Sequence, residues 1–518
     1  MTETTTAASP RVERWVLAAS ILGSSMAFID GTVVNVALPI LQEALGATAA
    51  EVQWVVESYA LVMAALLLLG GALGDKLGRR RVFATGAALF AVASGACALA
   101  PGIGWLILGR AVQGLGAALL VPGSLALIGA CIPPDRRGKA IGRWSAISAA
   151  AAGIGPLLGG WLVQEASWRA IFWLNIPLAA LTLFITLNHV PETRDPNARR
   201  LDLPGAGLVT LGLGGLVFGL LEAPRFGFGH PLIIAALSGG AVLLTAFVVV
   251  EARSTHPMVP LDLFRSRTFS GANLLTLLLY AALGGTLYFL PFDLIQVHHY
   301  PPAAAGAALM PLIVLISVLS AWAGRLVDRY GARAPLIVGP LTAALGFILL
   351  ALPGTSGNYW STFFPGIAVL GLGMAVTVAP LTTTVMGAVE AERAGLASGI
   401  NNSVSRTASL LSIAVFGIVA YHRFNQGLAQ RLNALDIPPE VQQLLADEQK
   451  KLAAAEIPPS IPPGVQSAVR AAIESSFVDA FRRVMLLCAA LAVGGAVCAW
   501  IFIGNRPGRT PTPRRADG

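Results

Sequence analysis

Fourteen long apolar runs constrain this chain more than any other feature of its sequence. Each has roughly 20 mostly apolar residues, the length that an α-helix needs to cross the hydrocarbon core of a bilayer. Because the runs are continuous rather than alternating, a membrane β-barrel is excluded. The sequence therefore predicts an all-α integral membrane protein. We place its spans at 15–39, 52–73, 82–100, 105–130, 140–163, 170–188, 204–222, 231–250, 270–293, 303–326, 335–353, 361–386, 397–421 and 483–503.

Composition supports a membrane protein and argues against other classes. Only 12% of the 518 residues are charged, against about 25% in soluble domains. A net charge of +8 would suit a soluble nucleic-acid binder. Here the basic residues lie in short loops between apolar runs, so we expect no nucleic-acid partner. The four cysteines have no CxxC spacing and the six histidines no ligand spacing, so we expect neither a disulfide nor a metal site.

Lysine and arginine are concentrated in alternate loops, which predicts the orientation of the chain. By the positive-inside rule, the basic loops and both tails, 1–14 and 504–518, are expected in the cytoplasm. Arg11 and Arg14 precede the first apolar run, and this combination resembles a signal peptide. Because many spans follow, we interpret this run as an uncleaved first helix. The basic loops are 75–81, 133–143, 189–203, 251–269, 327–334 and 387–396.

One long loop, 422–482, is predicted on the opposite side of the membrane. Proline pairs punctuate two amphipathic stretches in it, at about 440–456 and 465–481. We expect a small helical cap there. A docking surface for a periplasmic or extracellular partner is the alternative.

An internal repeat divides the chain into two halves. GALGDKLGRR (71–80) aligns without a gap with GRLVDRYGAR (324–333), and each copy follows an apolar span. Parallel halves related by an axis along the membrane normal are a known transporter design. We therefore expect one six-helix bundle over 15–188 and another over 270–503. The two spans in 204–250 are additional central helices.

Asp30 and Arg110 are charged residues inside apolar runs of the first half. Asp30 belongs to AFIDGTVVNVALP, and a carboxylate facing lipid is costly, so its side chain should face the protein interior or water. Arg110 and Gln113 in LGRAVQGLGAALL share one helix face. Asp30 has two possible roles. Either it is held permanently in a salt bridge or by hydrogen bonds, or it carries protons. For Arg110, the alternatives are a static pair and a part in proton coupling.

Four segments in order carry a resemblance to a known family. They are AFIDGTVVNVALP, GALGDKLGRRR, LGRAVQGLGAALL and GIGPLLGGWL, and SWRAIFWLNIP agrees with them. From about residue 15 to 503, the chain resembles the fourteen-helix drug/proton antiporter branch of the major facilitator superfamily, a group of multidrug efflux transporters. The resemblance implies the major facilitator fold and a link to antibiotic resistance. It also implies proton coupling through Asp30 and Arg110.

The resemblance further implies two sets of residues that move with the transport cycle. Glycines and a proline in helix 5 would form a hinge-like, leak-tight contact between the halves. The repeated loops would hold the cytoplasmic side shut, with Asp75 near the start of helix 13 and Asp328 near the start of helix 5. These conformational candidates are Gly71, Asp75, Gly78, Arg79, Arg80, Gly153, Gly155, Pro156, Gly159, Gly324, Asp328, Arg329 and Gly331.

Further polar and aromatic residues are candidates for the substrate path. Glu57 and Asp293 are the notable acids. Each is either a surface charge at the outer mouth or an acid of the path that attracts cations or binds a second proton. The aromatic residues either line a pocket or simply pack. The candidates are Asn35, Glu57, Gln113, Tyr280, Tyr288, Phe289, Asp293 and Met310.

Together these features predict a proton-coupled antiporter in the cytoplasmic (inner) membrane. Its expected partners are protons, membrane lipids and small amphipathic or cationic substrates such as drugs. No cofactor is expected, and no ATP, because the chain has no GxxxxGK[ST] loop. The alternatives are an exporter of a lipid or lipid-linked metabolite and an importer or uniporter of the same fold. An enzyme is disfavoured because no nucleophile or metal constellation lies at a membrane face.

Overall fold

The computed structural model describes residues 10–194, 202–254, 257–390, 393–435, 449–455, 457 and 463–504. Over these ranges the regular structure is entirely helical. Fourteen helices are long and apolar enough to cross a membrane. The prediction of an all-α membrane protein with fourteen spans is confirmed.

The first six spans pack into one bundle, here called the N-bundle. Helix α1 packs along α5, and α4 packs along both α2 and α3. The sixth span is broken at Leu174 into two helices. The helices are α1 (Pro10–Leu45), α2 (Ala49–Leu77), α3 (Arg79–Ala98), α4 (Ile103–Cys131), α5 (Pro134–Glu165), α6 (Ala170–Trp173) and α7 (Asn175–His189).

Two additional helices follow, α8 (Leu203–Phe226) and α9 (Pro231–Arg253). Helix α8 packs against α2 and α16, so it touches both halves of the molecule. Helix α9 packs mainly on α8. The most apolar stretch of α9 has a mean hydropathy of 2.5 and is only 11% buried. In a membrane protein, such a helix faces lipid.

The last six spans form a second bundle, the C-bundle, in which α10 packs on α16 and α18 and α15 packs on α12 and α13. Its elements are η1 (Leu261–Arg265), α10 (Arg267–Phe292), η2 (Asp293–Val297), α11 (Pro302–Ala308), α12 (Met310–Tyr330), α13 (Arg333–Leu350), α14 (Tyr359–Thr362), α15 (Phe364–Gly387), α16 (Ala394–Ala434), η4 (Gln449–Ala454) and α18 (Pro463–Phe502).

The sequence repeat corresponds to a structural repeat. Gly78 after α2 and Gly331 after α12 have φ angles of +113° and +74°, a backbone conformation that side chains with a Cβ disfavour. The repeated glycines before them also match. A Cβ at Gly71 would lie 3.5 Å from Pro122 of α4, and one at Gly324 would lie 4.0 Å from Ala379 of α15. The two bundles therefore pack equivalent helices through equivalent small residues.

The loop predicted at 422–482 is formed in large part by extensions of its two flanking helices. Helix α16 runs without a break to Ala434, and α18 begins at Pro463 and continues into the last span. At 1.5 Å per residue, the 41 residues of α16 measure about 60 Å, twice the thickness of a bilayer core. No proline interrupts 422–434, so nothing in the sequence ends the helix at the membrane surface. Most of the amphipathic stretch at 440–456 lies outside the described residues.

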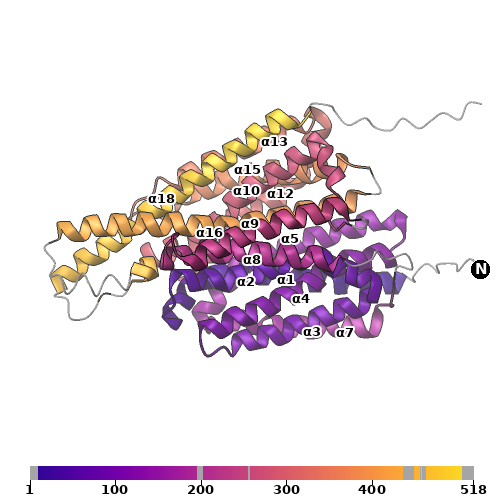
Figure 1. Cartoon of the computed structure of the whole chain (residues 1–518), viewed down its shortest axis with the longest axis horizontal. Coiled ribbons are helices and arrows are strands. Elements are labelled where there is room, and N and C mark those ends of the chain that lie inside the picture. Colours follow the sequence, from indigo (N-terminus) through magenta and orange to yellow (C-terminus); the bar gives the residue numbers. More distant parts are fainter. Residues whose placement is uncertain are drawn as a thin grey trace, which may run out of the picture.

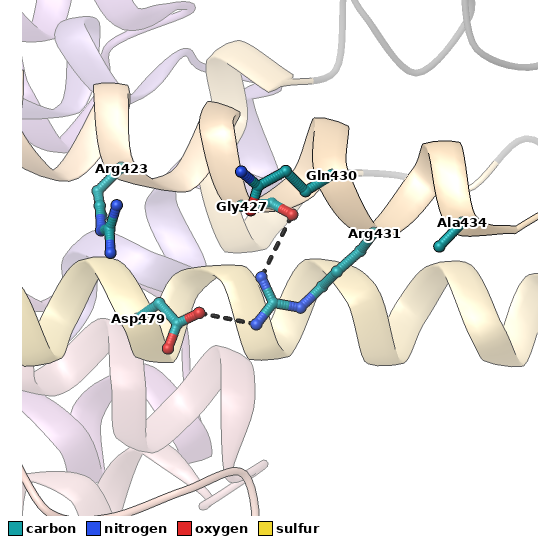
Figure 2. A pocket seen from close by; sticks show the side chains of 6 residues that line it. All are labelled: Arg423, Gly427, Gln430, Arg431, Ala434 and Asp479. Carbon is teal, nitrogen blue, oxygen red and sulfur yellow. Dashed lines mark hydrogen bonds and ion pairs between the residues drawn. The ribbon is translucent and has the colours of Figure 1, made fainter.

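The projecting parts of α16 and α18 form an antiparallel hairpin, visible in Figure 1. Arg431 of α16 donates to Asp479 of α18 at 2.7 Å and to Ser476 at 3.2 Å. A recess of about 340 Å³ lies beside this pair. Arg423 and Gln430 also line it, as Figure 2 shows. The docking of a partner on this hairpin stays a prediction.

The molecule has two distinct ends. The described chain starts at Pro10 and stops at Gly504 at one end, here called the terminal end, and the hairpin projects from the other, the hairpin end (Figure 1). At the hairpin end, η4 packs on α1 and α2 of the N-bundle and on α16 and α18 of the C-bundle. Gln296 of η2 also donates to Gln42 of α1 at 3.2 Å, and Gln42 donates to the Lys451 carbonyl at 3.1 Å. The bundles are thus joined at the hairpin end.

Close packing inside the N-bundle can be tested with two glycines of α4. A Cβ at Gly116 would lie 2.8 Å from the Phe90 nitrogen, whereas one at Gly129 would meet nothing within 4 Å. We expect Gly116→Ala to destabilise the protein by about 1–3 kcal/mol through overpacking. Gly129→Ala should be neutral or slightly stabilising. Thermal unfolding of both variants in one detergent checks this, and equal unfolding temperatures would contradict the packing described.

Candidate functional site

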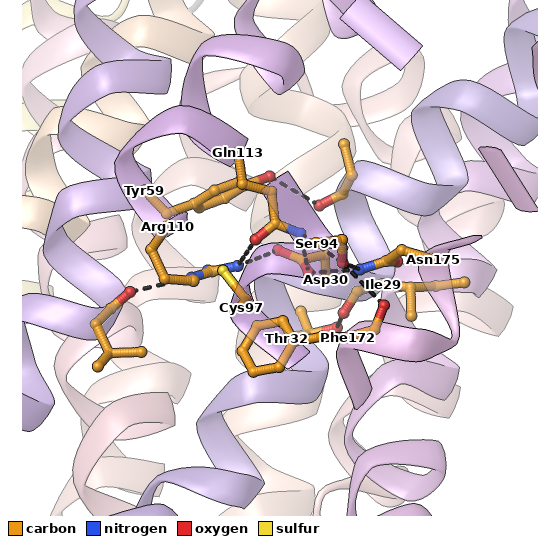
Figure 3. A network of polar contacts seen from close by, with 12 residues as sticks. Ile29, Asp30, Thr32, Tyr59, Ser94, Cys97, Arg110, Gln113, Phe172 and Asn175 are labelled. Atoms are coloured by element: carbon orange, nitrogen blue, oxygen red, sulfur yellow. Dashed lines mark hydrogen bonds and ion pairs between the residues drawn. The ribbon is translucent and has the colours of Figure 1, made fainter. Parts of the chain in front are cut away.

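The carboxylate of Asp30 lies at the centre of a buried polar network in the N-bundle. Its side chain is fully buried. Arg110 Nη1 donates to Oδ2 at 2.5 Å, and Gln113 Nε2 and Asn175 Nδ2 each donate to Oδ1 at 2.9 Å. Figure 3 shows these side chains converging from α1, α4 and α7. Asp30 therefore faces the protein interior, as the cost of a charge in lipid requires.

Arg110 holds more than one acceptor. Its Nε donates to the Val55 carbonyl of α2 at 3.1 Å, and its Nη1 also donates to Gln113 Oε1 at 2.7 Å. The guanidinium carbon lies 4.3 Å from the centre of the Tyr59 ring, a cation–π distance. Arg110 is 1% exposed, so these contacts replace the water that a buried guanidinium loses. The predicted neighbourhood of Asp30 and Arg110 is present in this structure.

Three residues of the network were not predicted as site residues: Tyr59, Ser94 and Asn175. Ser94 of α3 accepts from Asn175 at 2.9 Å and donates to the Phe172 carbonyl, also at 2.9 Å. Tyr59 of α2 donates to the Ala27 carbonyl at 3.2 Å. Their signal in the sequence is a lone polar residue inside an apolar span. That signal is weak, because many such residues bond only to their own helix, as Thr182 does.

The small residues of α5 lie between the two bundles. Gly155 and Gly159 face α1, where an added Cβ would meet Thr32 and Val33. Gly153 and Gly160 face the C-bundle, where it would meet Ile313 and Pro302. Backbone therefore approaches backbone on both sides of α5. This geometry suits the predicted contact between halves, and the hinge function assigned to it stays a prediction.

Pro156 gives this contact a polar component. As a proline it cannot donate to the carbonyl of Ala152, and Thr32 Oγ1 of α1 donates to that carbonyl at 2.9 Å instead. The acceptor that the proline frees is thus satisfied from a neighbouring helix.

The basic loop after α2 makes local contacts in this structure. Asp75 accepts from Arg79 Nε at 2.9 Å. The Arg80 backbone N–H donates to Glu192 Oε1 at 3.1 Å, and Arg80 Nη1 donates to the Val190 carbonyl at 3.3 Å. The expected contact of Asp75 with the start of helix 13, here α16, therefore stays a prediction. In the second copy, Arg329 lies over the ring of Tyr330, and the side chain of Asp328 lies outside the described part of the chain.

The two acids predicted for the outer mouth are not surface charges. Glu57 of α2 is 0% exposed and Asp293 of η2 is 1% exposed. Neither oxygen of Glu57 has a hydrogen-bond partner among the described residues, and neither has Oδ1 of Asp293. Oδ2 of Asp293 lies 3.7 Å from Nε2 of His298. Burial therefore rules out a surface charge at the outer mouth for both acids, and both are interior groups.

The remaining candidates for the substrate path differ in how far they are buried. Tyr288 and Phe289 are buried and pack edge to face, with ring centroids 4.9 Å apart. Tyr280, Asn35 and Met310 are half-buried. The structure thus brings Gln113 to Asp30 and places the aromatic residues of α10 in a separate group in the C-bundle.

The Asp30–Arg110 pair can be tested by a double-mutant cycle. Arg110→Gln alone should cost about 3–5 kcal/mol, because it leaves a buried carboxylate without its cation. The double variant Asp30→Asn/Arg110→Gln should lose less than the sum of the two single variants, since no buried charge remains. Unfolding in one detergent measures all four proteins. Additive losses would show that the two side chains are not coupled.

Comparisons with known proteins agree with this architecture. The family model described as Major Facilitator Superfamily matches residues 20–413. The multidrug resistance protein Stp of Mycobacterium tuberculosis is 37% identical over 86% of this chain and 81% of its own length. The tetracenomycin C resistance and export protein of Streptomyces glaucescens is 31% identical over 96% of this chain and 93% of its own.

Solved structures show the same fold. A bacterial homologue of the human lysosomal transporter Spinster, inward-facing and unoccupied, gives a TM-score of 0.65 at 19% identity over 97% of this chain and 100% of that one. The xylose transporter XylE from E. coli, inward open, gives 0.57 at 14% identity over 96% and 98%. The chain therefore belongs to the Major Facilitator Superfamily, and it is a membrane transporter rather than an enzyme.

Proposed function

We propose that this transporter is a proton-coupled antiporter that exports small amphipathic or cationic compounds across the cytoplasmic membrane by alternating access. The terminal end would face the cytoplasm and the hairpin end the outside, as the basic loops predict. The names of the relatives support drug export, because they describe resistance to several unrelated compounds. The single observation that carries proton coupling is the buried Asp30–Arg110 pair.

The geometry around Asp30 supports a proton carrier because the charge of Arg110 can be held in more than one way. When Asp30 is ionised, the guanidinium neutralises it at 2.5 Å. When Asp30 takes up a proton, Arg110 keeps its acceptors on Val55 and Gln113. The arginine therefore need not enter lipid or lose all partners in either state. Uptake from the outside and release inside, with substrate moving outward, complete the exchange.

The direction of transport follows from the driving force. A proton entering the cell releases the free energy of both the pH gradient and the membrane potential. The potential alone contributes about 2.3 kcal/mol per elementary charge per 100 mV. The two bundles would supply the movement by rocking about a substrate site between them.

Reconstitution into liposomes with an imposed pH gradient tests the proposal. Ethidium, tetraphenylphosphonium and puromycin serve as probes, and a trapped pH dye reports proton flux. We expect uphill movement of a probe that is coupled to opposite proton flux. Asp30→Asn should abolish the coupling, because its amide cannot carry a proton. Asp30→Glu should retain part of it.

The matched control is Glu43→Gln, which removes an exposed carboxylate from the same helix and should transport as the wild type does. Gel filtration and ethidium binding establish that the Asp30 variant is folded. Coupling that persists in folded Asp30→Asn would overturn the assignment of Asp30. If the wild type moves the probe only downhill, at a rate that does not depend on the pH gradient, the protein is a uniporter instead.

A further inference from the structure

Glu57 is a buried acid that the mechanism above does not use. Its side chain is 0% exposed, and both carboxylate oxygens lack a partner among the described residues. Asp30 is equally buried, yet it has three donors. Two equally buried acids of one bundle therefore differ in whether hydrogen-bond donors reach their carboxylates.

Glu57 lies where the bundles meet. It is on α2, which packs against α16 of the C-bundle. One turn earlier, Gln53 lies against Gly417 of α16 so closely that a Cβ there would strike its side chain. In the C-bundle, Tyr288 of α10 packs on Phe289 and on Phe292, with a ring separation of 5.4 Å between Tyr288 and Phe292.

Among the described residues, no donor reaches either carboxylate oxygen of Glu57. Arg110 is the basic residue of α4, and its Nε and Nη1 donate to the Val55 carbonyl, to Asp30 and to Gln113. Glu222 of α8 accepts from Trp54, and Arg406 of α16 lies over Phe28 of α1. The arginines at the start of α3 lie at the far, terminal end of α2. The ionisable groups on the elements around Glu57 include Asp30, Glu51, Tyr59, Arg110, Glu222, Tyr288, Arg406, Lys450 and Lys451.

An ionised carboxylate in such a place is very costly. Removing it from water without a cation or donors costs far more than a protein conformational equilibrium can supply, and such groups take up a proton instead. The closed contact between α2 and the C-bundle therefore accommodates a neutral Glu57. When the hairpin end opens, water reaches this contact and the acid can ionise.

We propose that Glu57 is a second proton-binding site, and that its protonation permits the bundles to close at the hairpin end. Closure is then linked to one proton taken from the side that the hairpin faces. The proposal deepens the proposed function and rests on it only for the direction of the proton. Asp293, a further buried acid at the same end, lies on η2, where its Oδ2 is 3.7 Å from Nε2 of His298.

The test measures closure itself rather than transport. Nitroxide labels are placed at Glu165, exposed at the end of α5, and at Ser356, exposed in the loop after α13, with Cys498 replaced by alanine. Double electron–electron resonance in lipid nanodiscs gives the distance between them from pH 5 to pH 9. We expect the short distance at low pH and a longer one at high pH. One linked proton changes the ratio of the two populations by up to about tenfold per pH unit.

Three variants decide the result. Glu57→Gln should keep the short distance at every pH, because it is always neutral, and Glu57→Asp should restore a pH response. Glu43→Gln, the exposed acid on α1, should behave as the wild type. A wild type without any pH response, or a Glu57→Gln variant that titrates like the wild type, would overturn the proposal.

Failure of the proposed function gives a different pattern. Asp30→Asn should still show the pH-dependent distance change, even though its coupled transport is lost. If transport proves not to be proton-driven while the distance still responds through Glu57, the second site stands and the antiport mechanism falls. If transport is proton-driven through Asp30 while the distance ignores Glu57, the antiport mechanism stands and the second site falls.

Discussion

The hydrocarbon core of a membrane contains no water, and this constraint shapes every polar group in the structure. Each group that helix geometry leaves free must find a partner inside the protein. The Ala152 carbonyl freed by Pro156 accepts from Thr32 of a neighbouring helix. Asp30 obtains three donors from two helices. Small residues make such partnerships accessible, because they let the backbones of α1 and α5 approach closely.

The two buried acids of the N-bundle satisfy this constraint in different ways. At Asp30 the compensating charge is an arginine that belongs to the protein, so the site persists whether or not a proton is bound. At Glu57 the described structure supplies no donor, so only a proton can compensate it. An acid with a resident cation is suited to exchange within a stable site. An acid without one makes the contact that buries it conditional on protonation.

The sequence predicted the fold well because the bilayer imposes length and hydropathy directly on each span. The fourteen spans and the repeat of the two halves were therefore accessible. The proximity of Asp30 to Arg110 followed from the family resemblance instead. Partners such as Ser94 and Asn175 were not, because their roles depend on which helix faces align. The burial of Glu57 was missed for a related reason. Its position near the end of a span suggests a water-exposed mouth, but η4 and α16 cover that end of α2.

The contacts that join α5 to α11 and α1 to η2 are neutral. The contact of α5 with α11 joins backbone to backbone through Gly160 and Gly306, and no charged side chain has to lose water there. Gln42 and Gln296 likewise exchange neutral hydrogen bonds with each other or with water. These contacts favour closure equally at any pH. A carboxylate in the same interface adds a term that depends on proton concentration, and the contact then responds to the gradient.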